Sequence, residues 1–316
     1  SEINGLGQNS FRIFDTTFLR AGEECMNSPL FESHIRELYD ILDNCEMSPR
    51  EIQLRKKRIE QSIDLIKKEE SLSAYSQYHQ RAHEIESIPF LKQFGNLIIT
   101  EDWKHSEGCD FVLNGHIYIE CVCASAGDIS KNKLNEFMGE GVFDYNKKKE
   151  ILNTRFTSSL NDKVRFYYER VGKSIPEDSP YIIFLKTGSL AYEWFEEKYG
   201  MALLDILLGR GFLRITINTA SGKFIDSGYT HRDYIEKYNG KKINCNLFLN
   251  NDFRCVSAIL LATSPLGVKY SYKNTFLFIN PFASHKIFAK DFWGLIYWKA
   301  NKEGYYIPRR KGRTLS

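Results

Sequence analysis

Hydrophobic and polar positions alternate most clearly in residues 108–123, where two strand-like runs flank an Asn-Gly turn signal at residues 114–115. A two-residue loop would put Asp110 and Glu120 on opposite faces of this hairpin, whereas a three-residue loop would place them directly across from one another. Only the three-residue loop leaves one face entirely apolar, made of Phe111, Leu113, Ile117, Ile119, Cys121 and Cys123. We therefore expect the three-residue loop, with Asp110 facing Glu120.

Two carboxylates that face each other across a hairpin lie within about 5 Å at their Cβ atoms. Like charges in that position destabilise the strand pairing unless a cation lies between them. Mg²⁺ or Mn²⁺, which prefer oxygen ligands, would provide the compensating charge. The hairpin therefore predicts a divalent-cation site at Asp110 and Glu120.

The residues before the hairpin favour helices. Residues 14–19 and 33–42 have helical character, and a break is expected at residues 44–49. Residues 49–86 combine dense charge with an apolar stripe at helical spacing, which predicts one long helix. Its acidic and basic residues alternate in sign, which is more typical of a solvated face than of a nucleic-acid-binding patch.

Short strands and a second helix follow an Ile-Pro pair at residues 88–89, which predicts a break. We expect strands at residues 97–100 and in both hairpin arms, then an irregular insertion at residues 125–153 with a short helix at 131–138. A helix at residues 154–171 and a buried strand at residues 181–185 complete the series. The order helix, strand, strand, strand, helix, strand predicts an α/β chain with a mixed sheet and a crossover helix.

The remaining residues predict an α+β extension of that sheet. A helix is expected at residues 190–208, and strand character recurs at residues 212–218, 243–249, 254–262 and 276–279, before a packed aromatic segment at 291–300. No linker rich in Pro, Gly or Ser separates independent domains. We expect a mainly helical region at residues 1–86 that contributes the first core helix, a core at 87–187, and an extension at 188–316 packed on that core.

The composition is that of an ordinary soluble globular protein, with 42% hydrophobic and 26% charged residues. The formal charge of +3 permits a polyanionic partner without requiring one. The seven cysteines lack the spacing of a disulfide framework or a zinc site, so we expect buried free thiols in a reducing compartment. No run approaches the roughly 18 apolar residues of a membrane helix, and no signal peptide is visible. These features favour a cytoplasmic protein without membrane attachment, and they leave delivery into a host cell open.

The expected order of elements, with an Asp before the second strand and a Glu on the third, resembles the PD-(D/E)XK nuclease superfamily. That family has the restriction-endonuclease-like αβββαβ core, and the resemblance covers roughly residues 50–187. It implies that Asp110, Glu120 and the carbonyl of Cys121 hold Mg²⁺ or Mn²⁺. It also implies a third acid from the preceding helix, for which Glu84 and Glu86 are the candidates.

The chain departs from the family pattern at two positions. Cys109 stands where Pro is usual, and Val122 stands where the family has the Lys that orients the attacking water. The helix at residues 154–171 offers a substitute cation, because Arg155 and Lys163 lie along one side of it. Lys163, with Tyr167 four residues later, resembles the Gln-x-x-x-Tyr helix motif of the RecB-like branch. We expect Lys163, or failing that Arg155, to neutralise the charge that develops on the attacked phosphate.

A purely structural interpretation of the same residues stays open. Any amphipathic helix has a polar edge, so the row that contains Arg155 and Lys163 needs no catalytic role. The acid pair could likewise consist of one solvated carboxylate and one that is bridged to Arg155 or Lys163.

The resemblance implies metal-dependent hydrolysis of nucleic-acid phosphodiester bonds, with DNA as the favoured substrate. The alternative is a catalytically inactive module that binds nucleic acid or protein, such as a bacterial effector or defence component. A homodimer or another protein partner is left open. The sequence lacks the motifs of other common classes. It has no phosphate-binding glycine loop and no G-x-S-x-G motif of serine hydrolases. His79 and His83 do not form the H-E-x-x-H motif of zinc proteases.

Overall fold

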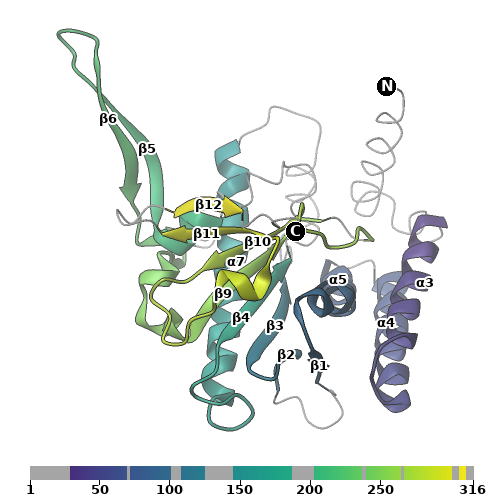
Figure 1. Cartoon of the computed structure of the whole chain (residues 1–316). Helices are drawn as coiled ribbons and strands as arrows, with labels where there is room; N and C mark the ends of the chain where they lie inside the picture. Colours follow the sequence, from purple (N-terminus) through teal and green to yellow (C-terminus); the bar gives the residue numbers. More distant parts are fainter. Residues whose placement is uncertain are drawn as a thin grey trace, which may run out of the picture.

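A mixed eight-stranded sheet forms the centre of the protein in the computed structural model (Figure 1). The structure describes residues 29–69, 72–100, 108–124, 145–186, 203–236, 240–264, 267–300 and 306–310. The strands lie in the order β1-β2-β3-β4-β9-β10-β11-β12. Their bounds are β1 (Leu97–Ile99), β2 (Phe111–Leu113), β3 (Ile117–Cys123), β4 (Tyr181–Lys186), β9 (Val256–Ala262), β10 (Thr275–Ile279), β11 (Ile296–Ala300) and β12 (Tyr306–Arg310).

The strand directions follow from the connections. β1, β2 and β3 are antiparallel neighbours, whereas β3 and β4 are parallel, because the helix α7 (Tyr145–Arg170) lies between them in the sequence. β9 continues the sheet parallel to β4, and β10 to β12 extend it further. The expected α/β class, the mixed sheet and its extension by the C-terminal half are therefore confirmed.

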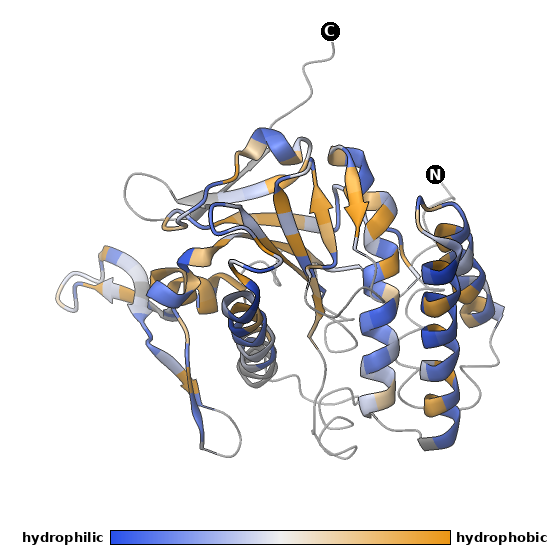
Figure 2. Ribbon diagram, turned by 90° about the horizontal axis from the view of Figure 1, so that it is seen from below, coloured by the Kyte–Doolittle hydropathy of each residue, from blue (hydrophilic) through white to orange (hydrophobic). Residues whose placement is uncertain are grey.

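Helices cover both faces of the sheet. The other long helices are α3 (Pro29–Asp43), α4 (Pro49–Glu69) and α5 (Leu72–Leu91). α5 packs on one face of the sheet through residues such as Phe90, and α7 packs on the other through residues such as Leu160. α3 and α4 pack on α5 through a separate apolar cluster (Figure 1). Figure 2 shows the strands of the main sheet as its most apolar layer, while the helices carry polar residues on their outer sides.

None of the helices in the described part of the chain combines the length and the apolar character that crossing a membrane requires.

The register of the β2–β3 hairpin is the predicted one. Phe111 pairs with Ile119, and Leu113 pairs with Ile117, so the loop has three residues. The first two of them, Asn114 and Gly115, have positive φ angles of 53° and 73°, which Asn and Gly adopt at low cost. The apolar face packs under α5, so the hydrophobic alternation selects this register over the two-residue loop.

Three predictions about the helices are wrong. Residues 49–86 form parts of two helices, and α5 continues through Pro89 past the expected break. α4 and α5 pack against one another, so that their apolar side chains share one cluster. Proline costs α5 a backbone hydrogen bond, and burial of Phe90 and Leu91 on the sheet offsets that cost. α7 begins at Tyr145, earlier than expected. The helices predicted at residues 14–19 and 131–138 lie outside the described residues.

The segment predicted as a strand at residues 212–218 does not join the main sheet. Instead, β5 (Arg210–Ile217) and β6 (Phe224–His231) form a separate hairpin, which extends away from the sheet in Figure 1. A further small hairpin joins β7 (Tyr234–Glu236) and β8 (Lys242–Asn244). The strand character expected over residues 243–249 ends at β8, because Asn246 has a φ of 60° and a 3₁₀ turn follows. Of the helix predicted at residues 190–208, the described part, residues 203–208, is helical.

Glu86 and Lys186 form a buried ion pair between α5 and the end of β4. Lys186 Nζ donates to Glu86 Oε2 at 2.6 Å, and the Lys186 side chain is 1% exposed. Glu86 also accepts from His34 Nε2 and from the Tyr270 hydroxyl, each at 3.0 Å. Burial alone would raise the pKa of Glu86, but the charge of Lys186 and the hydrogen bond from His34 hold that pKa well below its usual range. One carboxylate therefore joins α3, α5, β4 and the segment around Tyr270.

We expect Glu86→Gln to lower the free energy of unfolding by about 3–5 kcal/mol at pH 7, because Lys186 would lose its buried counter-charge. The folded-state pKa of Glu86 is depressed, so its stabilisation is present above the unfolded-state pKa of about 4.3 and is lost as the pH falls. The difference between the variant and the unaltered chain should therefore shrink towards pH 3, as measured by urea unfolding. The control is Glu37→Gln, which removes the partner of the exposed Lys269 and should cost less than about 1 kcal/mol. Equal losses in both variants would contradict the prediction.

Candidate active site

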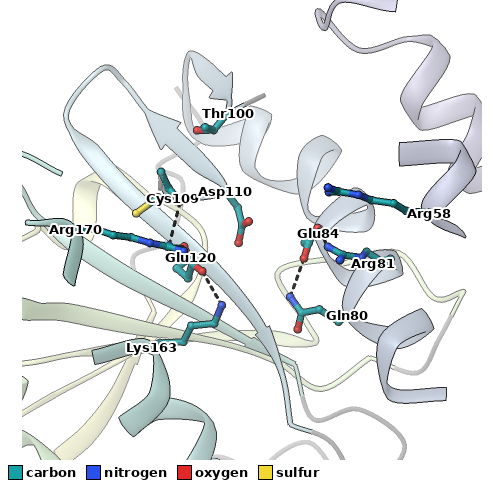
Figure 3. Close-up of a pocket in the computed structure, with 11 residues that line it drawn as sticks. Arg58, Gln80, Arg81, Glu84, Thr100, Cys109, Asp110, Glu120, Lys163 and Arg170 are labelled. Carbon is teal, nitrogen blue, oxygen red and sulfur yellow. Dashed lines mark hydrogen bonds and ion pairs between the residues drawn. The ribbon is translucent and has the colours of Figure 1, made fainter. Parts of the chain in front are cut away.

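A pocket of about 330 Å³ lies between α5, α7 and the β2–β3 hairpin (Figure 3). Its charged lining residues are three acids and four bases: Glu84, Asp110, Glu120, Arg58, Arg81, Lys163 and Arg170. The two acids of the hairpin and the base predicted from the following helix therefore meet in one cavity.

The side chains of Asp110 and Gln80 complete the hydrogen bonding of β3 beyond the end of β2. β2 starts at Phe111, so its pairing with β3 ends at Ile119 and does not extend to Cys121 and Cys123. Asp110 Oδ2 accepts from the Cys121 N–H at 2.7 Å. Gln80 Nε2 donates to the Cys121 carbonyl at 3.2 Å, and Gln80 Oε1 accepts from the Cys123 N–H at 2.7 Å. Buried backbone groups require hydrogen-bond partners, so these bonds fix Asp110 at the open end of the hairpin. They also fix α5 next to the edge of β3.

Glu120 is held by two cations. Its side chain is 6% exposed, with Oε1 at 2.6 Å from Lys163 Nζ and Oε2 at 3.3 Å from Arg170 Nη1. Arg170 Nη1 also donates to the carbonyl of Gly108 at 3.1 Å, which ties the end of α7 to the start of the hairpin. Burial lowers the pKa of Lys163, but the charges of Glu120 and Asp110 outweigh that effect and raise it, so the ammonium group is charged.

Asp110 is the acid of the pocket whose charged form is disfavoured by its surroundings. Burial, together with the negative charges of Glu120 and Glu84, raises its pKa well above the usual range, although Lys163 acts in the opposite direction. Asp110 is therefore near enough to Glu120 and Glu84 for their negative charges to oppose its ionisation. A buried acid with a perturbed pKa in a pocket, as Asp110 is, is typical of functional sites.

The structure separates the two candidates for the third acid. Glu84 lines the pocket, where its Oε1 accepts from Gln80 Nε2 at 2.9 Å and its Oε2 lies 3.6 Å from Arg81 Nη1. Glu86 belongs to the buried network with Lys186 on another side of α5. Residues two apart on a helix point about 200° apart, so only one of the two can face the hairpin.

Of the two predicted bases, only Lys163 lines the pocket. Arg155 lies eight residues earlier on α7, a distance of about 12 Å along the helix axis, and it is not among the pocket's lining residues. Cys121 is also not among the lining residues: its side chain packs in the apolar cluster under α5, and its carbonyl lies at the β3 edge next to Asp110.

The sequence alone did not place six of the lining residues in the site, namely Arg58, Gln80, Arg81, Thr100, Gly108 and Arg170. Helical spacing could have predicted two of them. Arg170 follows Lys163 by seven residues and Gln80 precedes Glu84 by four, so each lies on the same helix face as a predicted site residue. No pattern in the sequence could have predicted the position of Arg58, since that position depends on how α4 packs against α5.

Three carboxyl side chains, which could supply oxygen ligands to a divalent cation, line the pocket. Within the described residues, no three Asp, Glu, His or Cys side chains stand close enough to coordinate one ion as they are. Asp110, Glu120 and Glu84 nevertheless line one pocket, and oxygen atoms are the ligands that Mg²⁺ and Mn²⁺ prefer. Asp110, Glu120 and Glu84 are the residues that would hold the cation.

Comparison of the chain with protein-family models, with curated proteins and with solved structures finds no match.

The Lys163–Glu120 pair should show strong energetic coupling in a double-mutant cycle. We expect Lys163→Met to lower the free energy of unfolding by about 2–4 kcal/mol, because Glu120 stays buried with only Arg170 beside it. The loss should be smaller when Glu120→Gln is already present, which gives a coupling energy of about 1–3 kcal/mol in urea unfolding. The matched control is the exposed pair Arg165 and Asp162, for which Met and Asn substitutions should couple by less than about 0.5 kcal/mol. Coupling of equal size in the two cycles would show that Glu120 is effectively solvated.

Proposed function

We propose that this protein is a divalent-metal-dependent phosphodiesterase that cleaves nucleic acid, with DNA as the first substrate to test. The observation that carries the proposal is the position of Lys163, whose Nζ lies 2.6 Å from Glu120 in the pocket that also holds Asp110. Val122 stands where the PD-(D/E)XK pattern has a lysine, so that position has no positive charge. Lys163 on α7 supplies a positive charge instead.

The arrangement of the elements supports the same proposal. The series α5, β1, β2, β3, α7, β4 has the order of the αβββαβ core, with β3 antiparallel to β2 and parallel to β4. Asp110 precedes β2 and Glu120 lies on β3, as in the acids of the PD-(D/E)XK pattern. Glu84 on the helix before the sheet provides the third acid.

The proposed division of labour follows from the contacts. A cation held by Asp110, Glu120 and Glu84 would supply Lewis-acid activation of the phosphate and of an attacking water. Lys163 places a charged ammonium group beside these acids, where it can stabilise negative charge that develops on the phosphate. Arg170 fixes the second oxygen of Glu120, and the hydrogen bond from Cys121 to Asp110 fixes that carboxylate relative to β3.

A second candidate function is that of a non-catalytic module that binds nucleic acid or protein. One observation favours it: both oxygens of Glu120 are engaged by Lys163 and Arg170, so a cation must compete with two internal positive charges. Such a module would retain salt-dependent nucleic-acid binding without cleavage.

Cleavage of plasmid DNA and of single-stranded RNA, measured with Mg²⁺, with Mn²⁺ and with EDTA, tests the proposal. Asp110→Asn and Glu120→Gln should each lower the rate by about 10²–10³-fold or more, because each removes charge from the reacting centre. The matched control is Asp162→Asn, a carboxylate-to-amide change on the exposed face of α7, which should keep full activity. Cleavage that survives in both site variants, or that persists in EDTA, would reject the proposed mechanism.

Cation binding can be measured without a substrate. At a Mn²⁺ concentration 100 times the Kd, binding to the folded state adds about 2.7 kcal/mol of stability, which should raise the Tm of the unaltered chain by roughly 5 °C. Asp110→Asn should abolish most of this rise, whereas Asp162→Asn should retain it. A rise of the same size in all three proteins would place the Mn²⁺ site elsewhere.

A further inference from the structure

The pocket receives a side chain from a helix outside the αβββαβ series. Arg58 lies on α4, which packs on α5 and not on the sheet, yet it lines the same cavity as Asp110 and Glu120. Arg81 reaches the cavity from α5. In Figure 3 both arginines enter from the helical side, facing the hairpin that carries the two acids.

A buried ion pair one turn earlier positions Arg58. Arg55 Nε donates to Glu51 Oε1 at 2.7 Å, and Arg55 Nη2 donates to the carbonyl of Thr100 at 3.1 Å. The Glu51 and Arg55 side chains are 0% and 5% exposed. α4 is thereby attached to the chain just after β1, and the next turn of the helix brings Arg58 to the pocket.

Two guanidinium groups close together are unfavourable without an anion. Burial and the charge of Arg81 lower the pKa of Arg58, although Glu51 and Glu84 act in the opposite direction. Each guanidinium has five N–H donors in a planar fork that suits a phosphate. The carboxylate of Glu84 lies 3.6 Å from Arg81 and accepts from Gln80, and Arg58 and Arg81 line the same pocket as Glu84.

We propose that Arg58 and Arg81 form a binding site for a phosphate group of the substrate strand, next to the phosphate that is attacked. The inference rests on the proposed function for the identity of the strand as nucleic acid. The ligand is either an internal phosphodiester or a terminal 5′-phosphate, since both present the same oxygens to an arginine fork. Lys163 and Arg170 remain beside Glu120, so Arg58 and Arg81 would bind a phosphate other than the one that Lys163 stabilises.

The test is equilibrium binding of a 3′-fluorescein-labelled 16-base-pair DNA duplex in EDTA, measured by anisotropy at several salt concentrations. Arg58→Gln should weaken binding about 5–20-fold at 0.1 M salt and reduce the slope of log K against log salt by about 1, which corresponds to one phosphate contact. Arg58→Lys should keep the slope and recover only part of the affinity, because it keeps the charge and loses the fork.

The matched control is Lys57→Gln, the same loss of charge at an exposed position next to Arg58 on α4, which should bind within twofold of the unaltered chain. The Tm of each variant verifies folding. Duplexes with a 5′-phosphate and with a 5′-hydroxyl distinguish the two ligands: dependence of the Arg58 effect on the 5′-phosphate identifies the terminal group, and independence identifies the internal diester.

Equal affinity and slope for Arg58→Gln and Lys57→Gln would overturn the phosphate site. Absence of binding by the unaltered chain to the duplex and to its single strands would overturn both this inference and the proposed function. Arg58-dependent binding by a protein that cleaves neither DNA nor RNA would support the phosphate site and reject the hydrolase.

Discussion

The site depends on a difference in length between two neighbouring strands. β3 runs to Cys123, whereas β2 stops pairing with it at Ile119, so one edge of β3 must find hydrogen bonds elsewhere. Asp110 supplies one from the chain just before β2, and Gln80 supplies two from α5. The edge of β3 beyond β2 therefore fixes the carboxylate of Asp110 next to the pocket. It also aligns α5, the helix that carries Glu84.

The buried charges around that pocket do not maximise the free energy of unfolding. Burying Glu120 with Lys163 carries a desolvation cost that an apolar pair of similar size would avoid. Asp110 adds repulsion to the cost of burial, since it lies near two other acids and its pKa is raised. A chain selected only for packing would have no reason to keep three carboxylates there, which is why their arrangement favours chemistry or binding.

Much of the core could be predicted because it depends on local alternation. The hairpin register follows from the apolar face of β2 and β3, and the position of Lys163 follows from helical spacing and the need for a cation near Glu120. The errors occurred where distant contacts decide the outcome. Pro89 stays helical because the sheet buries its neighbours, Arg155 is too far along α7, and Arg58 reaches the pocket only because α4 folds back on α5. None of those contacts leaves a periodic signal in the sequence.

The carboxylate of Glu86 has a consequence for the order of events during synthesis. Its partners Lys186 and Tyr270 lie 100 and 184 residues further along the chain. While the ribosome is still adding those residues, α3 and α5 can already associate, and His34 can pair with Tyr78 and Glu86, but Glu86 still lacks Lys186 and Tyr270. The N-terminal helices can therefore reach their final buried environment only after most of the protein has emerged, which makes late, long-range closure an intrinsic part of how this chain matures.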